Sequence, residues 1–297
     1  MDRLRALEVF VAVAEAGSLA GAAKVMSMSA PTVTRVLGNL EADLGVLLFH
    51  RSTRATTLTD PGRSFLTDAQ RILDDYQASS DAARGAHRAP KGVLRLTAPT
   101  LFGQAYVSPI LLDFLDQFDE VDAEAIYLDR VVNIIDEGFD VAVRIGALTD
   151  TNLMAVRVGT VRRVVCAGAA YLSQHGIPHV PGDLAGHRII AARPVSASNE
   201  WKFADGKAVK ISPRVSFSSV PAAITAAKSG WGLTRVLSYQ VGPDLDAGDL
   251  KIVLSEYEPE PLPVHIVHAE GRNVSAKVRA FVDIAAARLR ANSFLNL

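Results

Sequence analysis

The chemistry that the sequence offers most clearly is the reading of base edges in a DNA groove. A helix is expected to begin after Ser29, with an outer face of small groups, two hydroxyls and one guanidinium: Pro31, Thr32, Thr34, Arg35 and Gly38. In the major groove arginine reads guanine edges, and threonine methyl groups contact thymine. A solvated face of an ordinary helical hairpin carries similar residues, so this face alone leaves both interpretations open.

Two capped helices are expected to position that face. Gly17 can take the positive φ that ends a helix, and Ser18 offers its hydroxyl to the free N–H groups of the next one. Ser29 repeats this cap at the start of the following helix. Apolar residues then recur at helical spacing at Val33, Val36, Leu37, Leu40 and Leu44. Two short helices joined by a tight turn are the layout of a helix-turn-helix.

A basic turn follows the second of these helices. Residues 46–49 are apolar, residues 50–54 include His50, Arg51 and Arg54, and residues 56–58 are a second extended run. This order predicts a β-hairpin wing whose arginines meet phosphates or a minor groove, while Glu41 and Asp43 lie late in the helix, away from the groove. The predicted DNA contacts are Ser18, Ala30, Pro31, Thr32, Thr34, Arg35, Arg51, Ser52, Thr53 and Arg54.

Three stretches of this region resemble the amino-terminal signature of LysR-type transcriptional regulators. They are LEVFVAVAEAGSLAGAA from Leu7, LEADLGVLLFHR from Leu40 and LTDPG from Leu58. A weaker likeness continues through FDVAVRIG from Phe139, AYL from Ala170, WKF from Trp201 and AKVRAFVD from Ala276, so it covers essentially the whole chain. The sequence departs from the family pattern at Ala30, often a larger polar residue, and at Gly38, which costs about 1 kcal/mol of helix propensity.

Composition sets wider bounds. A chain of 297 residues that is 49% hydrophobic allows two or three cores, and its longest apolar stretches fall well short of the ~20 residues of a membrane span. We find no secretory signal and expect a soluble, cytoplasmic protein with no membrane partner. The net charge of −1 does not indicate a nucleic-acid binder, so that prediction depends on local placement of basic residues. Cys166 is the only cysteine, and we expect no metal and no cofactor.

One long helix is predicted after the wing. Thr59 and Asp60 are cap candidates, Pro61 lies in the first turn, and an apolar seam at spacings of four and three runs through Phe65, Ala69, Ile72 and Tyr76. We expect this seam to pair with the same helix of a second subunit, giving a homodimer or homotetramer. The far end is small or polar, which leaves packing against the protein's own domain as the alternative.

The rest of the chain alternates strands and helices, which predicts an α/β fold with a mostly parallel sheet. A helix is expected over residues 131–137, and two lobes are expected, with crossings near residues 159–163 and 263–269. The resemblance implies an effector-binding domain similar to periplasmic binding proteins. The predicted domains are a winged helix-turn-helix at 1–58, a linker and dimerisation helix at 59–90, and the effector domain at 91–297, with lobe I about 91–162 and 268–297 and lobe II about 163–267.

Ligands of open α/β sheets lie beyond the carboxyl ends of the strands, where loops and helix N-termini meet. Thr100 is expected to cap a helix suited to a carboxylate, and an organic acid fits this chemistry. In the family, matching positions contact inducers. The predicted effector contacts are Thr100, Leu101, Phe102, Ile145, Gly146, Ala147, Ser196, Ser198, Trp201, Phe217, Ser218 and Val220. Helix capping by the hydroxyls and core packing by the aromatic rings are the alternatives, and Arg144 can pair with Asp140 or with a ligand.

Catalytic motifs are missing from the sequence. No serine lies in a Gly-x-Ser-x-Gly elbow, and the histidines do not have metal-ligand spacing, so no enzyme is expected. The favoured function is a DNA-binding transcriptional regulator that responds to a small-molecule effector, with RNA polymerase as a further candidate partner. The alternative is a two-lobed small-molecule-binding protein without a DNA-directed function.

Overall fold

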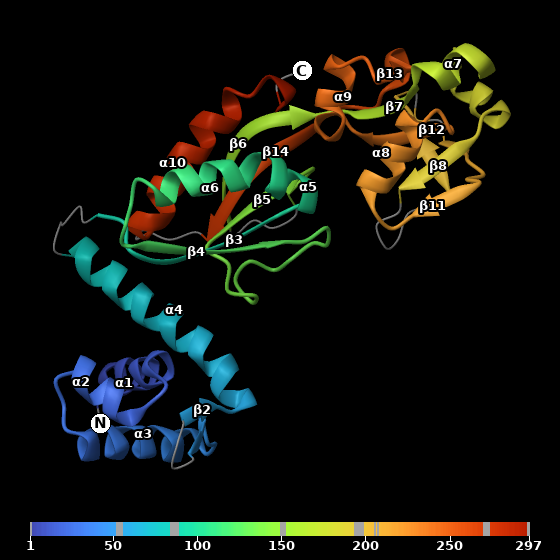
Figure 1. Cartoon of the computed structure of the whole chain (residues 1–297). Helices are drawn as coiled ribbons and strands as arrows, with labels where there is room; N and C mark the ends of the chain where they lie inside the picture. Colours follow the sequence, from blue (N-terminus) through green and yellow to red (C-terminus); the bar gives the residue numbers. More distant parts are fainter. Residues whose placement is uncertain are drawn as a thin grey trace. The chain divides into compact units, whose positions relative to one another are not determined.

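The computed structural model describes residues 2–51, 56–83, 89–148, 153–192, 199–204, 206, 208–269 and 274–295. The chain divides into two compact units. The first unit holds residues 1–92 together with the segments 135–138 and 271–279, and the second holds the remainder. Figure 1 labels the helices and strands of both units.

The first unit is a winged helix-turn-helix followed by a long helix. Gly17 and Gly45 take φ values of 61° and 71° at the ends of two helices, and the hydroxyls of Ser18 and Ser29 accept hydrogen bonds from N–H groups three residues later, which confirms the predicted caps. The antiparallel wing is confirmed too, although its first strand begins only at Phe49. The elements are α1 (Arg3–Ala16), α2 (Leu19–Val25), α3 (Ala30–Leu44), β1 (Phe49–Arg51), β2 (Thr56–Leu58) and α4 (Asp60–Ala83).

Aromatic rings from three elements form the centre of this unit. The ring centroid of Phe10 on α1 lies 5.4 Å from that of Phe49 on β1 and 5.2 Å from that of Phe65 on α4. Ala69 is fully buried in the same core. Tilted ring pairs at this separation add to the free energy of burial, so the first turns of α4 are fixed to the winged helix.

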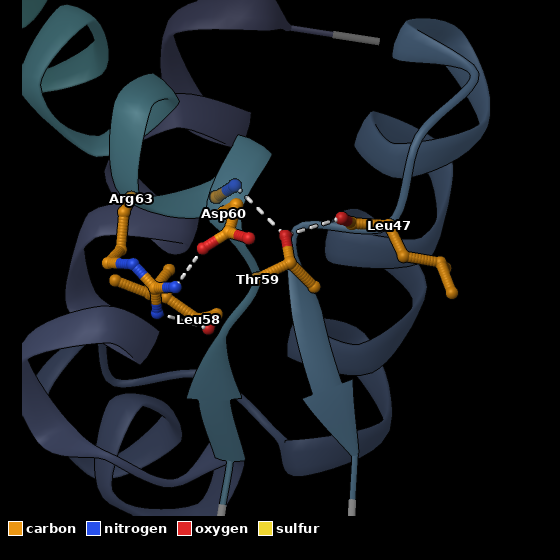
Figure 2. Close-up of polar contacts among 6 residues, drawn as sticks. Leu47, Leu58, Thr59, Asp60 and Arg63 are labelled. Atoms are coloured by element: carbon orange, nitrogen blue, oxygen red, sulfur yellow. Dashed lines mark hydrogen bonds and ion pairs between the residues drawn. The ribbon is translucent and has the colours of Figure 1, made fainter.

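Thr59 fixes the direction in which α4 leaves the wing. Its Oγ1 donates to the carbonyl oxygen of Leu47 at 2.8 Å and accepts from the N–H of Gly62 at 2.9 Å, as Figure 2 shows. Asp60 and Arg63 form an ion pair in the same turn. A Cβ atom on Gly62 would lie 2.1 Å from the carbonyl oxygen of Leu48, so this close approach requires glycine. The predicted cap by Thr59 is confirmed.

The second unit contains two five-stranded sheets. The first sheet has the strand order β4-β3-β5-β14-β6. The Phe114 ring on α6 packs edge-on against the Phe281 ring on α10, with centroids 5.4 Å apart. Its elements are β3 (Gly92–Ala98), α5 (Thr100–Phe102), a π-helix (Gly103–Val107), α6 (Ser108–Leu115), β4 (Val121–Tyr127), β5 (Val141–Ile145), β6 (Leu153–Val161), β14 (Leu262–Ala269), α10 (Ala276–Arg290) and a 3₁₀-helix (Ser293–Leu295).

The second sheet has the order β11-β8-β12-β7-β13. One face packs against Tyr171 and Trp201, and the other face packs against Ala223 and Ile224 of α8. Its strands and helices are β7 (Arg163–Gly168), α7 (Ala169–His175), β8 (Ile189–Ala192), β11 (Val215–Phe217), α8 (Val220–Lys228), β12 (Leu233–Leu237), α9 (Gly242–Asp246) and β13 (Leu250–Val253). A separate antiparallel pair is formed by β9 (Glu200–Lys202) and β10 (Ala208–Lys210). The 3₁₀-helices are Pro181–Gly186, Ser238–Gln240 and Ser255–Tyr257.

The α/β class and the presence of two sheets are confirmed, but the mostly parallel arrangement is wrong. Strand β14 runs antiparallel to β5 and β6, and β7 runs antiparallel to β12 and β13. Only Arg162 separates β6 from β7. Strand β6 leaves the first sheet toward the second and β14 returns from it, so these two neighbours run in opposite directions.

Two local predictions need correction. The second crossing lies within residues 254–261 rather than 263–269, because β14 already pairs with β6 from Leu262. No helix covers residues 131–137, although these residues are described. Val132 and Ile134 are buried, while Val131 is 88% exposed. Buried residues at every second position are typical of an extended chain and not of a helix.

The apolar helices of the described ranges are short. No single helix among them is long and apolar enough to cross a membrane. Helices α1 and α2 reach the required length and composition only as a pair bent by 120°.

Candidate nucleic-acid interface and effector site

The outer face of α3 presents one free cation among small groups. Pro31 and Arg35 are exposed, and within the described ranges the Arg35 guanidinium has neither a hydrogen bond nor an ion pair. The Thr34 hydroxyl donates to the carbonyl oxygen of Ala30 at 3.0 Å, which turns its proton inward. The Thr32 hydroxyl lies 2.7 Å from that of Ser29. This face therefore offers a guanidinium, threonine methyl groups and hydroxyl lone pairs.

Two further exposed residues, Asn39 and Lys24, were missed by the sequence interpretation, whereas His50 was named as part of the basic turn. Asn39 is exposed one turn after Arg35, Lys24 is exposed in the last turn of α2, and His50 is exposed on β1. The spacing of four between Arg35 and Asn39 was a usable signal, since both fall on one helix face. A Cβ atom on Gly38 would meet nothing within 4 Å, so packing does not explain this glycine.

The remaining predicted DNA contacts divide into two groups. Ser18 is half-buried and its Oγ accepts from the N–H of Gly21 at 3.0 Å, so this hydroxyl caps α2. The backbone of Arg51 pairs with that of Thr56 in the wing. The side chain of Arg51 and all of Ser52, Thr53 and Arg54 lie outside the described residues.

The predicted dimer seam is split by the structure. Phe65 and Ala69 pack into the core of their own unit, so their assignment to a subunit interface is corrected. Ile72 and Tyr76 are 40% and 56% exposed and lie one turn apart on α4.

A cavity of about 300 Å³ lies beside the start of α4, lined by Leu44, Val46, Leu48, Pro61, Ser64, Phe65 and Asp68.

Thr100 does not cap α5 as predicted. Pro99 occupies the N-cap position, and no side chain there makes a capping hydrogen bond. The N–H of Thr100 instead donates to Oδ1 of Asp129 at 2.9 Å. A carboxylate of the chain itself therefore takes the backbone donor that was predicted to meet an anionic ligand.

Phe102, a predicted effector contact, is a fully buried ring. Its centroid lies 5.1 Å from that of Tyr106 and 5.2 Å from that of Tyr239, and the Tyr106 hydroxyl donates to the backbone carbonyl of Tyr239 at 3.2 Å. Burial raises the pKa of both tyrosine hydroxyls, so they remain protonated at neutral pH. Leu101, which precedes Phe102 in the chain, is half-buried.

Strand β5 carries the next three predicted contacts at its end. Ile145 and Gly146 are half-buried and Ala147 is exposed. Gly146 takes a φ of 112°, a conformation that side chains rarely adopt, and its N–H donates to the carbonyl of Pro263 at 2.8 Å. Arg144 donates to the carbonyl oxygen of Val132 at 2.6 Å, and within the described residues it does not pair with Asp140.

The remaining predicted contacts come from the later part of the chain, between Ser196 and Val220. Trp201 is only 6% exposed, and the Arg235 guanidinium carbon lies 5.0 Å from its ring centroid. Phe217 is half-buried, Ser218 and Ser219 are exposed, and α8 begins at Val220 without a side-chain cap. The alternative of helix capping by a hydroxyl therefore does not apply to Ser219, which occupies the N-cap position of α8 without a capping hydrogen bond. Ser196 and Ser198 lie outside the described residues.

Comparison with known families matches both parts of the chain. Residues 4–63 match the bacterial regulatory helix-turn-helix proteins of the lysR family, and residues 87–290 match the LysR substrate binding domain. An HTH-type transcriptional regulator of Xanthomonas campestris pv. campestris (strain 8004) is 33% identical over 288 residues, covering 95% of this chain and 84% of that protein. The regulator CrgA of Neisseria meningitidis serogroup C (strain 8013) is 30% identical, covering 96% of this chain and 97% of that protein.

Solved structures agree with this match. The structure of CrgA, a LysR-type transcriptional regulator from Neisseria meningitidis, has a TM-score of 0.62 at 30% identity and covers 96% of this chain and 98% of that chain. The full-length Vibrio cholerae virulence activator AphB has a TM-score of 0.60 at 25% identity with the same coverage.

Proposed function

Since this chain belongs to the family of LysR-type transcriptional regulators, we propose specific roles for its residues in DNA binding, assembly and effector sensing. The protein is a DNA-binding regulator whose activity is modulated by a small-molecule effector, and its family consists of regulators rather than enzymes. We assign DNA binding to residues 1–58, the linker and subunit contact to 59–90, and effector binding to 91–297.

In our proposal α3 enters the major groove with its exposed face. The observation that carries this assignment is Arg35, an exposed guanidinium with no partner in the described part of the chain. Arginine can donate two hydrogen bonds to the O6 and N7 atoms of guanine, and Thr32 and Thr34 can offer methyl groups to thymine. Ala30 and Pro31 allow a close approach, while Arg51, Ser52, Thr53 and Arg54 of the wing meet the backbone or the minor groove.

The subunit contact is proposed for the exposed stripe of α4. Ile72 and Tyr76 leave apolar surface in water, which pairing with a second α4 would bury. A homodimer places two recognition helices on paired half-sites, and assembly into a tetramer extends this to four. Association with RNA polymerase is part of the same proposal, as is location in the cytoplasm, where a bacterial regulator meets its operator.

The effector is proposed to bind where the carboxyl ends of strands from both sheets meet the loops that follow them. The contacts proposed on the side of the first sheet are Thr100, Leu101, Phe102, Ile145, Gly146 and Ala147. Those proposed from the later part of the chain are Ser196, Ser198, Trp201, Phe217, Ser218 and Val220. We propose an organic acid as its class. Since Asp129 already pairs with the Thr100 N–H, the acid is not expected to bind at that donor.

Effector binding then selects one arrangement of the DNA-bound oligomer. The free energy available is limited to the difference in effector affinity between two states, typically about 1–3 kcal/mol. The proposal is tested by retention of genomic fragments on the full-length protein, followed by gel-shift titration of an enriched fragment. Failure to enrich any fragment over bulk DNA would exclude sequence-specific binding, and the alternative of a two-lobed binding protein would then stand.

A further inference from the structure

Two arginines lie on the same face of the second sheet. Arg235 on β12 is opposite Val165 on β7, and Leu237 is opposite Arg163. Side chains directly opposite one another in an antiparallel pair share a face, so Arg163 and Arg235 are diagonal neighbours on the face that packs against Trp201. Diagonal neighbours are about 7–8 Å apart, within reach of two long side chains.

The Arg235 guanidinium is held in place but is not neutralised. Its Nη1 donates to the carbonyl oxygen of Lys202 at 3.1 Å, and its Cζ lies 5.0 Å from the Trp201 ring centroid. Within the described ranges no carboxylate pairs with Arg235 or Arg163. Of five N–H donors one is used in a hydrogen bond, so the planar fork that matches a carboxylate remains free.

The surrounding charges do not compensate this cation. Burial and then the like charge of Arg163 lower the pKa of Arg235 to about 10, so the group is still charged at neutral pH. The carboxylate of Glu258 binds Nη1 of Arg162 with both oxygens, at 2.9 and 3.1 Å, and among the described residues it forms no ion pair with Arg235 or Arg163. A half-buried cation beside a second cation is costly without an anion, and a ligand can supply one.

The position of Arg235 fits the proposed effector site. Strands β8, β11 and β12 are parallel, so their carboxyl ends share one edge of the sheet. Tyr239, which follows β12, lies beyond that edge. Ligands of such sheets bind at this edge.

We propose that Arg235, with Arg163 beside it and the indole of Trp201 behind it, binds the carboxylate of the effector. This inference rests on the proposed function and deepens it, because it sets the orientation of the effector in its site. Its acidic end meets the second sheet, and the end that faces Asp129 on the first sheet is not acidic, since that carboxylate would repel it.

The test uses the full-length protein, titrated calorimetrically with acetate, succinate and benzoate, with benzamide as the neutral counterpart of benzoate and with inorganic phosphate as a second anion. We expect at least one carboxylate to bind and at least tenfold weaker binding in Arg235→Gln, since a charge-assisted hydrogen bond is lost. Arg235→Lys keeps the positive charge but not the planar guanidinium, so it should bind the carboxylate more tightly than Arg235→Gln and more weakly than the wild type. Arg188→Gln is the matched control, because this arginine also lies over a tryptophan ring, at 6.0 Å from Trp231.

The second readout is fluorescence of the Trp231→Phe variant, in which Trp201 is the one remaining tryptophan. A bound carboxylate should change its emission, and benzamide should not. The inference is overturned by a wild-type protein that binds no carboxylate of the series, by equal binding in Arg235→Gln, or by binding of phosphate alone. Gel-shift binding to an enriched DNA fragment is measured on the same samples. If the wild-type protein does not bind DNA, the proposed function fails, and this outcome is distinct from a failure of carboxylate binding.

Discussion

Oε1 of Glu41 accepts a hydrogen bond from the N–H of Leu48 at 2.9 Å, and the same atom accepts a second from Phe49 at 3.2 Å. Glu41 lies on α3 and is only 5% exposed, while Leu48 and Phe49 lead into the first wing strand. A buried carboxylate therefore joins the recognition helix to the wing. Charge-assisted hydrogen bonds of this kind are stronger than neutral ones, so the angle between helix and wing depends on Glu41.

Glu41→Ala should lower the free energy of unfolding by about 2–3 kcal/mol, because two buried N–H groups lose their acceptor. Glu41→Gln keeps an oxygen at the end of the side chain and should cost less. Urea unfolding of the full-length protein measures both values. The control is Asp43→Ala, exposed on the same helix, which should change stability by less than about 0.5 kcal/mol. Equal effects at the two positions would show that these hydrogen bonds contribute nothing.

Arg35→Ala should remove the preference for the operator and leave the fold intact, because the side chain points away from Val33 and Leu37, which are fully buried. The loss of a bidentate guanine contact is worth about 1–3 kcal/mol. Gel-shift titrations on specific and scrambled duplexes measure it, with Lys24→Ala as the comparison that should weaken both duplexes alike. Equal weakening of both duplexes by Arg35→Ala would reassign this residue to a phosphate contact.

Ile72→Asp combined with Tyr76→Asp should yield monomers, since pairing would place two carboxylates in an apolar contact. Phe65 is unsuitable for this test because its ring lies 5.2 Å from that of Phe10 in the core of the same unit. Light scattering gives the mass in solution, and Thr67→Asp, exposed on the other side of α4, is the control. An unchanged mass would assign association to the effector domains.

Local features of the first unit were predictable because short-range rules decide them. The caps at Gly17, Ser18, Ser29 and Thr59 follow from residue type and spacing, and each is present in the structure. The division of the α4 seam was not predictable, because helical spacing marks Phe65 and Ile72 alike as apolar. Only tertiary packing distinguishes the residue that contacts its own core from the one that stays exposed.

Predictions for the second unit failed where distant segments decide the outcome. Asp129, far from Thr100 in sequence, takes the N–H that was assigned to a ligand. Apolar residues over 131–137 suggested a helix, yet the carbonyl of Val132 accepts from Arg144 on β5. The placement of Arg163 and Arg235 on one face depends on the register between β7 and β12, which the sequence of either strand alone does not reveal.

The hydrogen bonds around the Tyr171 hydroxyl require His187 to be neutral. The Tyr171 hydroxyl accepts from the N–H of Arg188 at 2.9 Å, so its own proton is available to Nδ1 of His187 at 3.2 Å. The ring of His175 stacks on Tyr171 with centroids 4.4 Å apart. Burial and then the nearby charge of His175 lower the pKa of His187, while Asp183 opposes them.

The pKa of His187 is lower in the folded protein than in the unfolded chain, where it is about 6.5. As pH falls below about 6.5, the unfolded chain therefore binds more protons than the folded protein. The free energy of unfolding should decrease over this range, until pH falls below the pKa of His187 in the folded protein. His187→Asn keeps an acceptor near the Tyr171 hydroxyl but cannot titrate, so the melting temperature of this variant should fall less between pH 7.5 and pH 5.5 than that of the wild type. Part of the dependence should persist, since burial and Arg157 also lower the pKa of His265. His50→Asn, an exposed histidine on the wing, controls for the substitution itself. A melting temperature that falls equally in His187→Asn and the wild type would show that the Tyr171 group does not respond to pH.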